Sequence, residues 1–205
     1  MPALVDVTFD FRSDAAGGDP DRMSPTLRRY HQILWSKALP SGAMFTLETS
    51  RRAPYLYHQS SLGKFTLSSD SIIPTFTRWK RMQHIVTQIP EEENEAFRAI
   101  GYTIGGMMVW PANSVDGQRT INVERGLNTR IADRMDLTLE CVRRYYLGEP
   151  NPLGTTLARY AAFFALFGDF RGFLDHFLFQ DLVTADYSRV SFFMPFGPQP
   201  TQDRR

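Results

Sequence analysis

The stretch FFALFGDFRGFLDHFLFQDLV, residues 163–183, decides the fold of this 205-residue chain. Its aromatic side chains recur at every helical turn and wrap most of the helix circumference, which indicates burial on several sides. Gly168 divides the stretch, so one helix ends there and another runs from about Arg171 to Val183. The stretch therefore predicts a phenylalanine-rich helical core. An aromatic box for a cofactor is the alternative, and core packing is favoured.

Further helices are expected upstream. One covers roughly residues 131–147, and the next opens at Asn151-Pro152. Ser24-Pro25 is typical of a helix start, because the serine hydroxyl can cap the helix and proline fits its first position. Pro74 and the segment after Pro90 also predict helix starts.

Short alternating patterns in the rest of the chain are typical of strands. They lie at residues 5–11, 45–47, 55–58, 65–67, 102–110, 119–122 and 190–194. Gly105 and Gly106 interrupt the 102–110 pattern, which predicts a bulge or a close backbone approach. Asp116-Gly117 predicts a turn that leads into a returning strand at 119–122.

Together the patterns predict an α+β fold, with a small, mostly antiparallel sheet packed against a C-terminal aromatic-rich helical cluster. No repeat or linker divides the chain, so we expect a single domain over residues 1–205. Within it, residues 1–23 are expected to form a short strand and loop, and residues 197–205 a frayed tail.

The composition excludes disordered and fibrous proteins, since 42% of the residues are apolar and 22% are charged. Cys141 is the single cysteine, which excludes an internal disulfide and a cysteine-based zinc site and fits a reducing cytoplasm. The first residues lack the pattern of a signal peptide, and no apolar run approaches the roughly 20 residues of a membrane helix. We therefore expect a cytoplasmic protein with no membrane contact.

Charge is distributed unevenly along the chain. Residues 24–89 contain nine basic and two acidic residues, a balance of +7, whereas the whole chain has a net charge of +1. Such a segment favours an anionic partner, either a small molecule or a nucleic acid. The alternative is a solvated surface whose balancing acids lie nearby only in space.

Polar residues are densest between Asn113 and Arg144. On the expected helix, Asp133 and Glu140 share one sector with Arg144, so an acid there could be aimed at a substrate by its basic neighbours. The alternative is a ladder of ion pairs between Glu140 and the arginines three and four residues later, each contributing only tenths of a kcal/mol.

A glycine-containing turn precedes that helix. Asn122, Arg125 and Arg130 cluster around Gly126, and such a turn can present backbone N–H groups and guanidinium groups to an anion. The alternative is turn and capping chemistry, with Asn128 or Thr129 as the cap residue.

His58 is the best acid–base candidate among the four histidines, because Ser60 and Ser61 follow it and a histidine can act as base beside a hydroxyl. The alternative is a packing histidine. None of the four has a partner at a metal-ligand spacing, so a metal-dependent mechanism has the least support. The sequence indicates no particular cofactor.

The chain resembles a widespread bacterial family of uncharacterised proteins, a domain of unknown function. The resemblance rests on FDFRSDAAGGDPD, SPTLRRYHQILWSKALPSG, YLYHQSSLGKFTLSSDSIIPTF, IGYTIGGMMVWPAN, RTINVERGLNTRIADRMDLTLECVRRYYLG and FFALFGDFRGFLDHFLFQDLV. These segments span most of the chain from Phe9 to Val183. The resemblance implies family membership and no mechanism.

Our first hypothesis is an intracellular enzyme that acts on an anionic nucleotide or nucleic-acid ligand. Its site would form where His58, the Gly105-Gly106 segment and residues 125–144 converge. His58 would be the acid–base. The anion would be bound by Arg125, Arg130 and Arg144, with Asp133 or Glu140 as the orienting carboxylate.

Two alternatives remain open. One is a non-catalytic interaction or regulatory protein, in which the aromatic segment SFFMPFGP near the C-terminus docks a partner. The other is a direct RNA or DNA binder, whose affinity would fall steeply with salt. Residue types alone do not decide among the three.

Overall fold

The computed structural model describes residues 5–47, 56–71, 83–191 and 195–197. The helix predicted to begin at Pro74 and the tail at 198–205 lie outside these residues. None of the helices in this described part of the chain has the length and apolar character that crossing a bilayer requires.

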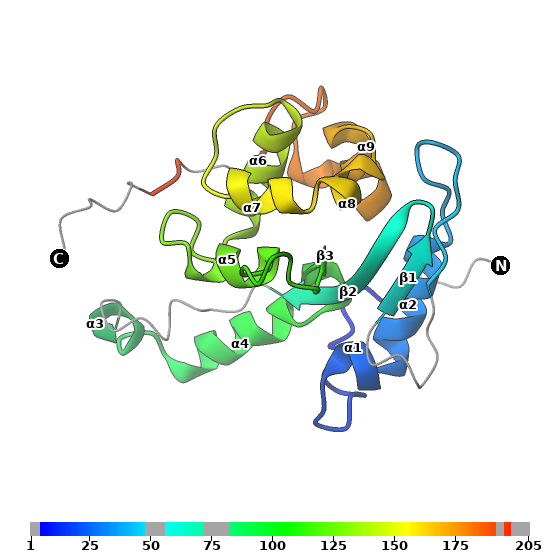
Figure 1. Ribbon diagram of the computed structural model, residues 1–205. Helices are drawn as coiled ribbons and strands as arrows, with labels where there is room; N and C mark the ends of the chain where they lie inside the picture. The colour runs from blue at the N-terminus through cyan, green and yellow to red at the C-terminus, as the bar shows by residue number, and fades with distance from the viewer. Residues whose placement is uncertain (1–4, 48–55, 72–82, 192–194, 198–205) are drawn as a thin grey trace.

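A three-stranded antiparallel sheet forms the centre of the fold (Figure 1). Strands β1 (Leu56–Ser60), β2 (Gly63–Ser71) and β3 (Met107–Pro111) lie in that order, with Leu56 opposite Leu67 and Asp70 opposite Met108. The predicted antiparallel pairing is confirmed for the described part of the 55–58 pattern, from Leu56 on, and for the 65–67 pattern. Side chains alternate along β2, so neighbouring residues of this strand point to opposite faces of the sheet.

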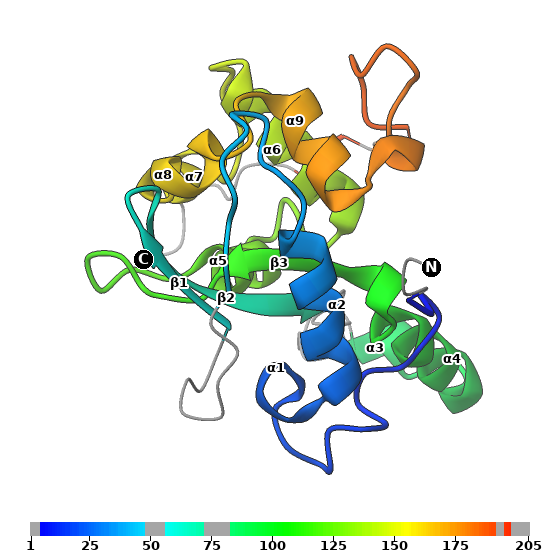
Figure 2. The same cartoon turned by 90° about the vertical axis from the view of Figure 1, so that its right-hand side faces the viewer.

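Helices surround the sheet on both sides. They are α1 (Pro20–Met23), α2 (Pro25–Trp35), α3 (Gln83–Val86), α4 (Glu91–Gly101), α5 (Ile121–Leu127), α6 (Met135–Tyr146), α7 (Gly154–Arg159), α8 (Ala161–Ala165) and α9 (Phe170–Phe177), with 3-10 turns η3 (Ile104–Gly106) and η4 (Gln180–Leu182). Figures 1 and 2 show α6 to α9 grouped above the sheet and α1, α2 and α4 below them. The start of α2 is as predicted, because the Ser24 hydroxyl accepts the Leu27 N–H at 3.0 Å.

The C-terminal helices enclose the predicted aromatic core. Phe167 and Phe173 meet edge to face with ring centroids 5.4 Å apart, and Trp110 of β3 stacks on Phe173 at 6.2 Å. Trp35 at the end of α2 approaches Phe163 from the other side, at 6.5 Å. Edge-to-face and offset contacts of this kind are the preferred geometries of aromatic rings. The α+β fold with its aromatic helical cluster is therefore confirmed.

The strand predicted at residues 5–11 is wrong, since these residues form turns with one bridge, from Asp10 to Thr103. Its backbone instead accepts hydrogen bonds from the 104–105 turn, where the Gly105 N–H lies 2.8 Å from the Val7 oxygen. A Cβ atom on Gly105 would lie 3.1 Å from that oxygen. The predicted close approach is thus present, and the strand expected from 102 begins only after it, at Met107.

Three other predictions of regular structure need correction. Residues 119–122 are the entry to α5, because the Thr120 hydroxyl caps that helix and accepts the Val123 N–H. The 45–47 pattern forms no strand, and the only bridge described near it joins Ala38 to Met44. The expected 151–168 helix is divided at Tyr160 into α7 and α8. In each case a local cap or turn overrides a short pattern.

The helix expected from residue 131 begins only at Met135. Ala132 and Asp133 have φ angles of 53° and 62°, in the left-handed region that a right-handed helix excludes. At the other end, Gly148 has a φ of 69° and stops the chain from continuing as a helix, as its residue type predicts.

Candidate functional site

Ser69 and Asp70, neighbours near the end of strand β2, face different layers of helices. Ser69 points to α2, where its hydroxyl lies 2.6 Å from the Nε2 atom of His31. Asp70 points to the opposite face and binds Arg125 of α5. Because side chains alternate along the strand, the consecutive residues Ser69 and Asp70 belong to two different groups of polar side chains, one on each face of the sheet.

Arg125 is the centre of the group on the α5 face. Its side chain is fully buried, and every nitrogen of the guanidinium group has a partner. Nε donates to the Thr138 hydroxyl at 3.2 Å, Nη1 binds Asp70 and lies 3.1 Å from an Asp133 carboxylate oxygen, and Nη2 donates to the Asp133 carbonyl at 3.1 Å. Such a set of bonds is needed because a buried charge without partners costs several kcal/mol.

The turn before α6 is held in a strained conformation by the same arginine. Non-glycine residues rarely adopt positive φ, and Ala132 and Asp133 do so consecutively. The Asp133 N–H donates to the Arg125 carbonyl at 3.1 Å, so main chain and side chain of Arg125 both bind Asp133. Strain of this kind persists only where surrounding contacts enforce it, and it is concentrated at functional sites.

Asp21 is the centre of the group on the α2 face. Leu56 and Leu67 are the last residues paired between β1 and β2, so the Ser69 N–H has no partner in β1. It donates instead to both Asp21 carboxylate oxygens, at 3.0 Å. One of these oxygens lies 3.9 Å from the His31 Nε2 atom. We call Asp21, His31, Ser69, Asp70, Asn122, Arg125, Asp133 and Thr138 the Arg125 cluster.

Burial changes the proton affinity of the acids in this cluster. It raises the pKa of Asp21 to about 7, and the nearby Asp70 charge acts in the same direction. It raises the pKa of Asp70 to about 6, with Arg125 opposing the increase and Asp133 adding to it. Burial also lowers the pKa of His31 to about 3, so this imidazole is neutral at physiological pH. Two carboxyl groups can thus exchange protons near neutrality, which is where acid–base catalysis is most effective.

A cavity of about 370 Å³ adjoins the strained turn. Its wall includes Arg134 and Met135, the two residues that follow Asp133, together with the half-exposed ring of Phe97 from α4. The lining is largely apolar, and the Arg134–Asp136 ion pair, with a bond of 3.0 Å, supplies its charge. The volume lies in the range typical of small-molecule sites.

The sequence profile of a family of unknown function, DUF6994, matches residues 5–203. The chain belongs to this family. No match was found among curated proteins or among solved structures. Family membership, expected from the sequence segments, is thereby confirmed for nearly the whole chain, while a bacterial origin stays a prediction.

Three of the predicted site residues lie together in the Arg125 cluster. Asp133 binds Arg125, and the Asn122 side chain binds Asp70. The environment of Arg125 differs from the one expected, because its guanidinium group is directed at internal partners and is fully buried. We therefore reassign Arg125 from anion contact to the positioning of Asp70 and Asp133.

Glu140 lies on α6 in the ladder that was the alternative interpretation. Its carboxylate accepts from Arg143 Nε at 2.8 Å and from Arg144 Nε at 2.7 Å. Burial alone would raise the pKa of Glu140, but these two bonds hold it below its usual value. Glu140 is therefore ionised at neutral pH and held by both arginines.

Arg130 and Arg144 contact the C-terminal segment. Their guanidinium carbons lie 5.7 and 5.0 Å from the ring centroid of Phe196, within cation–π range. Arg130 Nε also donates to the Gly197 carbonyl at 2.9 Å. The described part of the aromatic tail, 195–197, thus packs on its own chain through the two arginines expected to bind an anion.

The other predicted residues lie elsewhere. Gly105 and Gly106 form the η3 turn against the N-terminal segment. His58 is buried on β1 and stacks on Phe45 with ring centroids 3.7 Å apart. Its partners are the Thr46 carbonyl and the Ser60 hydroxyl, so it belongs to a polar group of its own.

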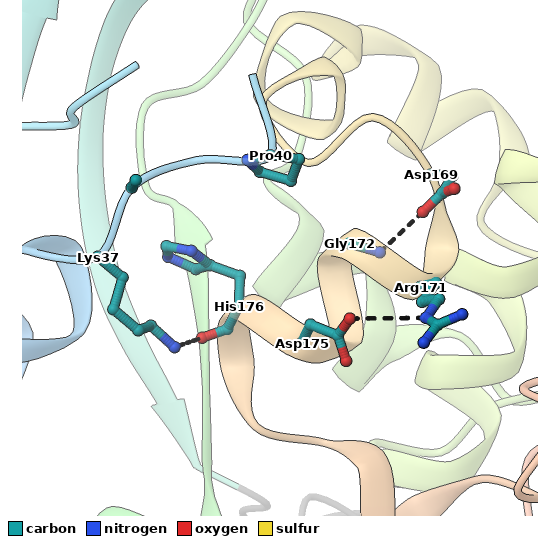
Figure 3. A pocket seen from close by; sticks show the side chains of 8 residues that line it. Lys37, Pro40, Asp169, Arg171, Gly172, Asp175 and His176 are labelled. Carbon is teal, nitrogen blue, oxygen red and sulfur yellow. Dashed lines mark hydrogen bonds and ion pairs between the residues drawn. The ribbon is translucent and has the colours of Figure 1, made fainter. Parts of the chain in front are cut away.

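A second cavity, of about 400 Å³, lies between the loop after α2 and helix α9 (Figure 3). Lys37 donates to the His176 carbonyl, and Arg171 lies 3.8 Å from Asp175. Burial lowers the pKa of His176 to about 4, so its ring is neutral. The charged groups of this cavity therefore bind one another or the backbone, and we place no reaction there.

Sequence reasoning missed Asp21, His31, Ser69 and Asp70. They come from two distant parts of the chain, the consecutive helices α1 and α2 and the end of β2, and their contacts depend on the packing of these helices against the strand. One usable signal was present, because aspartate is depleted in strands and Asp70 directly follows the alternating pattern at 65–67. Within the described residues, no group of His, Cys, Asp or Glu side chains is arranged to hold a metal ion.

Proposed function

We propose that the protein is an enzyme acting on a nucleotide-type anionic ligand, with the Arg125 cluster as its acid–base centre. The observation that carries the proposal is the placement of two buried carboxyl groups on either face of strand β2, with Asp21 bound to the Ser69 N–H and Asp70 bound to Arg125. Burial raises the pKa of Asp21 to about 7 and that of Asp70 to about 6, which is near physiological pH. Perturbed acids of this kind are concentrated at functional sites.

The cavity beside α6 supports the choice of ligand. Phe97 and Met135 offer an apolar surface on which a nucleobase can stack, and beside them lies Arg134, which would exchange its bond to Asp136 for one to a phosphate. Arg134 and Met135 of this wall directly follow Asp133, so the wall continues from the turn that Arg125 holds. The +7 balance of residues 24–89 would attract an anion by long-range electrostatics.

The test combines binding with turnover. Isothermal titration calorimetry would measure the affinity for AMP, ATP and NAD, and chromatography would follow conversion of each. We expect at least one of these nucleotides to bind. Phe97→Ala should weaken that binding by about tenfold to 100-fold, because it removes roughly 1–3 kcal/mol of stacking. Asp70→Asn should leave the affinity unchanged and lower turnover by about 100-fold or more.

Asp116→Asn is the matched control, since Asp116 lies in an exposed turn and Asn tolerates its positive φ. It should change neither binding nor turnover. If no nucleotide binds at millimolar concentration, or if Asp70→Asn and Asp116→Asn behave alike, the proposal is wrong. Salt-sensitive binding of a short RNA without turnover would favour a nucleic-acid binder instead.

A further inference from the structure

His58 and Ser60 form a polar pair outside the Arg125 cluster. They are two residues apart on β1, so both side chains lie on one face of the sheet. The Ser60 hydroxyl oxygen lies 2.7 Å from the His58 Nε2 atom, and the His58 Nδ1 atom lies 2.6 Å from the Thr46 carbonyl oxygen. The hydroxyl expected beside this histidine is therefore present.

The hydrogen bonds fix the direction of proton transfer. A carbonyl oxygen can only accept, so Nδ1 carries the hydrogen and Nε2 presents a lone pair to Ser60. The Ser60 oxygen in turn accepts the Leu62 N–H at 3.0 Å. The chain of bonds thus leaves the hydroxyl hydrogen pointing at a base, and the Leu62 N–H fixes the position of the serine oxygen.

The base is rigid and the nucleophile is accessible. The imidazole stacks on Phe45 at 3.7 Å and on Phe65 at 6.2 Å, which fixes its plane. His58 is only 2% exposed, whereas Ser60 is exposed at the end of the β1–β2 hairpin. A cavity of about 470 Å³ opens on the other face of the same strand, lined by Thr46, Leu47, Tyr57 and Gln59, so the approach to the pair is through the exposed Ser60 itself.

We propose that Ser60 is a nucleophile activated by His58, and that this site cleaves small carboxylic esters with good leaving groups. Ser60 Oγ would bond to the acyl carbon while its proton passes to His58 Nε2. The ester C–O bond would then break, and the leaving alkoxide would take that proton. Water would hydrolyse the acyl-serine by the same route in reverse, releasing the carboxylic acid and restoring Ser60.

The orienting group limits the substrate class. In serine proteases a carboxylate holds the histidine and stabilises the imidazolium that forms. Here a neutral carbonyl, that of Thr46, has this place and stabilises the positive charge less. Esters with acidic leaving groups need less help from the base than amides do, so they fit this site better.

The chain contains an internal comparison. Ser69 contacts His31 at 2.6 Å, but the His31 Nδ1 atom is buried and has no hydrogen-bond partner in the structure. Among the residues that the structure describes, no group therefore hydrogen-bonds to Nδ1 to orient this imidazole, and burial lowers the pKa of His31 to about 3. A serine probe should therefore distinguish the two pairs.

The test uses the full chain, a fluorophosphonate probe with peptide mapping, and hydrolysis of p-nitrophenyl acetate. We expect one label, on Ser60, and ester hydrolysis above the rate of unfolded protein. Ser60→Ala should abolish both, and His58→Gln should slow both by about 100-fold or more. Ser61→Ala is the matched control, because Ser61 is an exposed serine in the same turn, and it should retain both activities.

Labelling of Ser69 or Ser61 in place of Ser60, an absence of labelling, or full activity of Ser60→Ala would each overturn the inference. His58→Gln alters a stacked core residue, so its thermal unfolding is compared with that of the wild type. If it does not fold, the comparison of Ser60→Ala with Ser61→Ala decides the question. These results are independent of the proposed nucleotide activity, which Asp70→Asn tests separately.

Discussion

Replacement of Arg125 by methionine tests the structural basis of the Arg125 cluster. The substitution keeps an unbranched, apolar side chain in the core and removes the guanidinium group. It leaves four acceptors without their donor: the Thr138 hydroxyl, the Asp70 and Asp133 carboxylates, and the Asp133 carbonyl. Removing one partner of a buried ion pair costs about 3–5 kcal/mol.

Proton uptake limits the loss. Asp70 has a pKa of about 6 even with Arg125 present, so its protonation at pH 7 costs only about 1.4 kcal/mol. Without the guanidinium group this proton is bound still more readily. We therefore expect Arg125→Met to lower the free energy of unfolding by about 3–5 kcal/mol at pH 7, and by less at pH 5.

Urea denaturation followed by tryptophan fluorescence measures this loss, because Trp35 and Trp110 are buried and report on the core. Arg171→Met is the control, since Arg171 is 68% exposed and its pair with Asp175 is worth about 0–1 kcal/mol. A loss below about 1 kcal/mol for Arg125→Met, or a loss equal to that of the control, would refute the description of Arg125 as a buried ionic centre.

Three further predictions follow from the described contacts. The folded-state pKa of Asp21, about 7, lies above its unfolded value, so its contribution to stability is full below about pH 4 and is lost as pH rises toward 7. Urea titrations between these pH values should show that the wild type loses on the order of 4 kcal/mol more free energy of unfolding than Asp21→Asn does. Equal pH profiles for the two proteins would contradict the raised pKa. Burial raises the pKa of the Cys141 thiol to about 12, so a thiol reagent at pH 8 should modify it only after unfolding, and rapid modification of the native protein would contradict this burial. A Cβ atom on Gly172 would lie 2.0 Å from the Phe167 carbonyl oxygen, so Gly172→Ala should lower the thermal midpoint by several degrees. Gly42 has a positive φ, but a Cβ atom there would meet no atom within 4 Å. Gly42→Ala should therefore lower the free energy of unfolding by only about 1 kcal/mol.

Local signals predicted several features correctly. Ser24-Pro25 gave the start of α2 because a cap and a proline act within one helical turn. The Gly105-Gly106 pair indicated a close backbone approach, although the partner, the N-terminal segment near Val7, could not be identified from the sequence. The His58–Ser60 contact followed from a spacing of two on a strand.

Long-range contacts explain what the sequence could not show. The pattern at 5–11 alternates like a strand, but its backbone bonds to a turn about a hundred residues away. The delayed start of α6 depends on Arg125 holding Asp133 at positive φ, which no helix pattern reveals. Asp21, Ser69 and Asp70 become one site only when α1 packs beside the end of β2.

The most direct test of the account is a carboxyl titration of protein labelled with ¹³C at the aspartate side chains. NMR spectra recorded from about pH 3 to pH 9 would be assigned with Asp21→Asn and Asp70→Asn. We expect Asp21 to titrate at about 7 and Asp70 at about 6, and the pKa of Asp21 to fall when Asp70 is replaced by asparagine. If both titrate near 4 like exposed aspartates, neither holds a proton near neutral pH and the Arg125 cluster is not an acid–base centre.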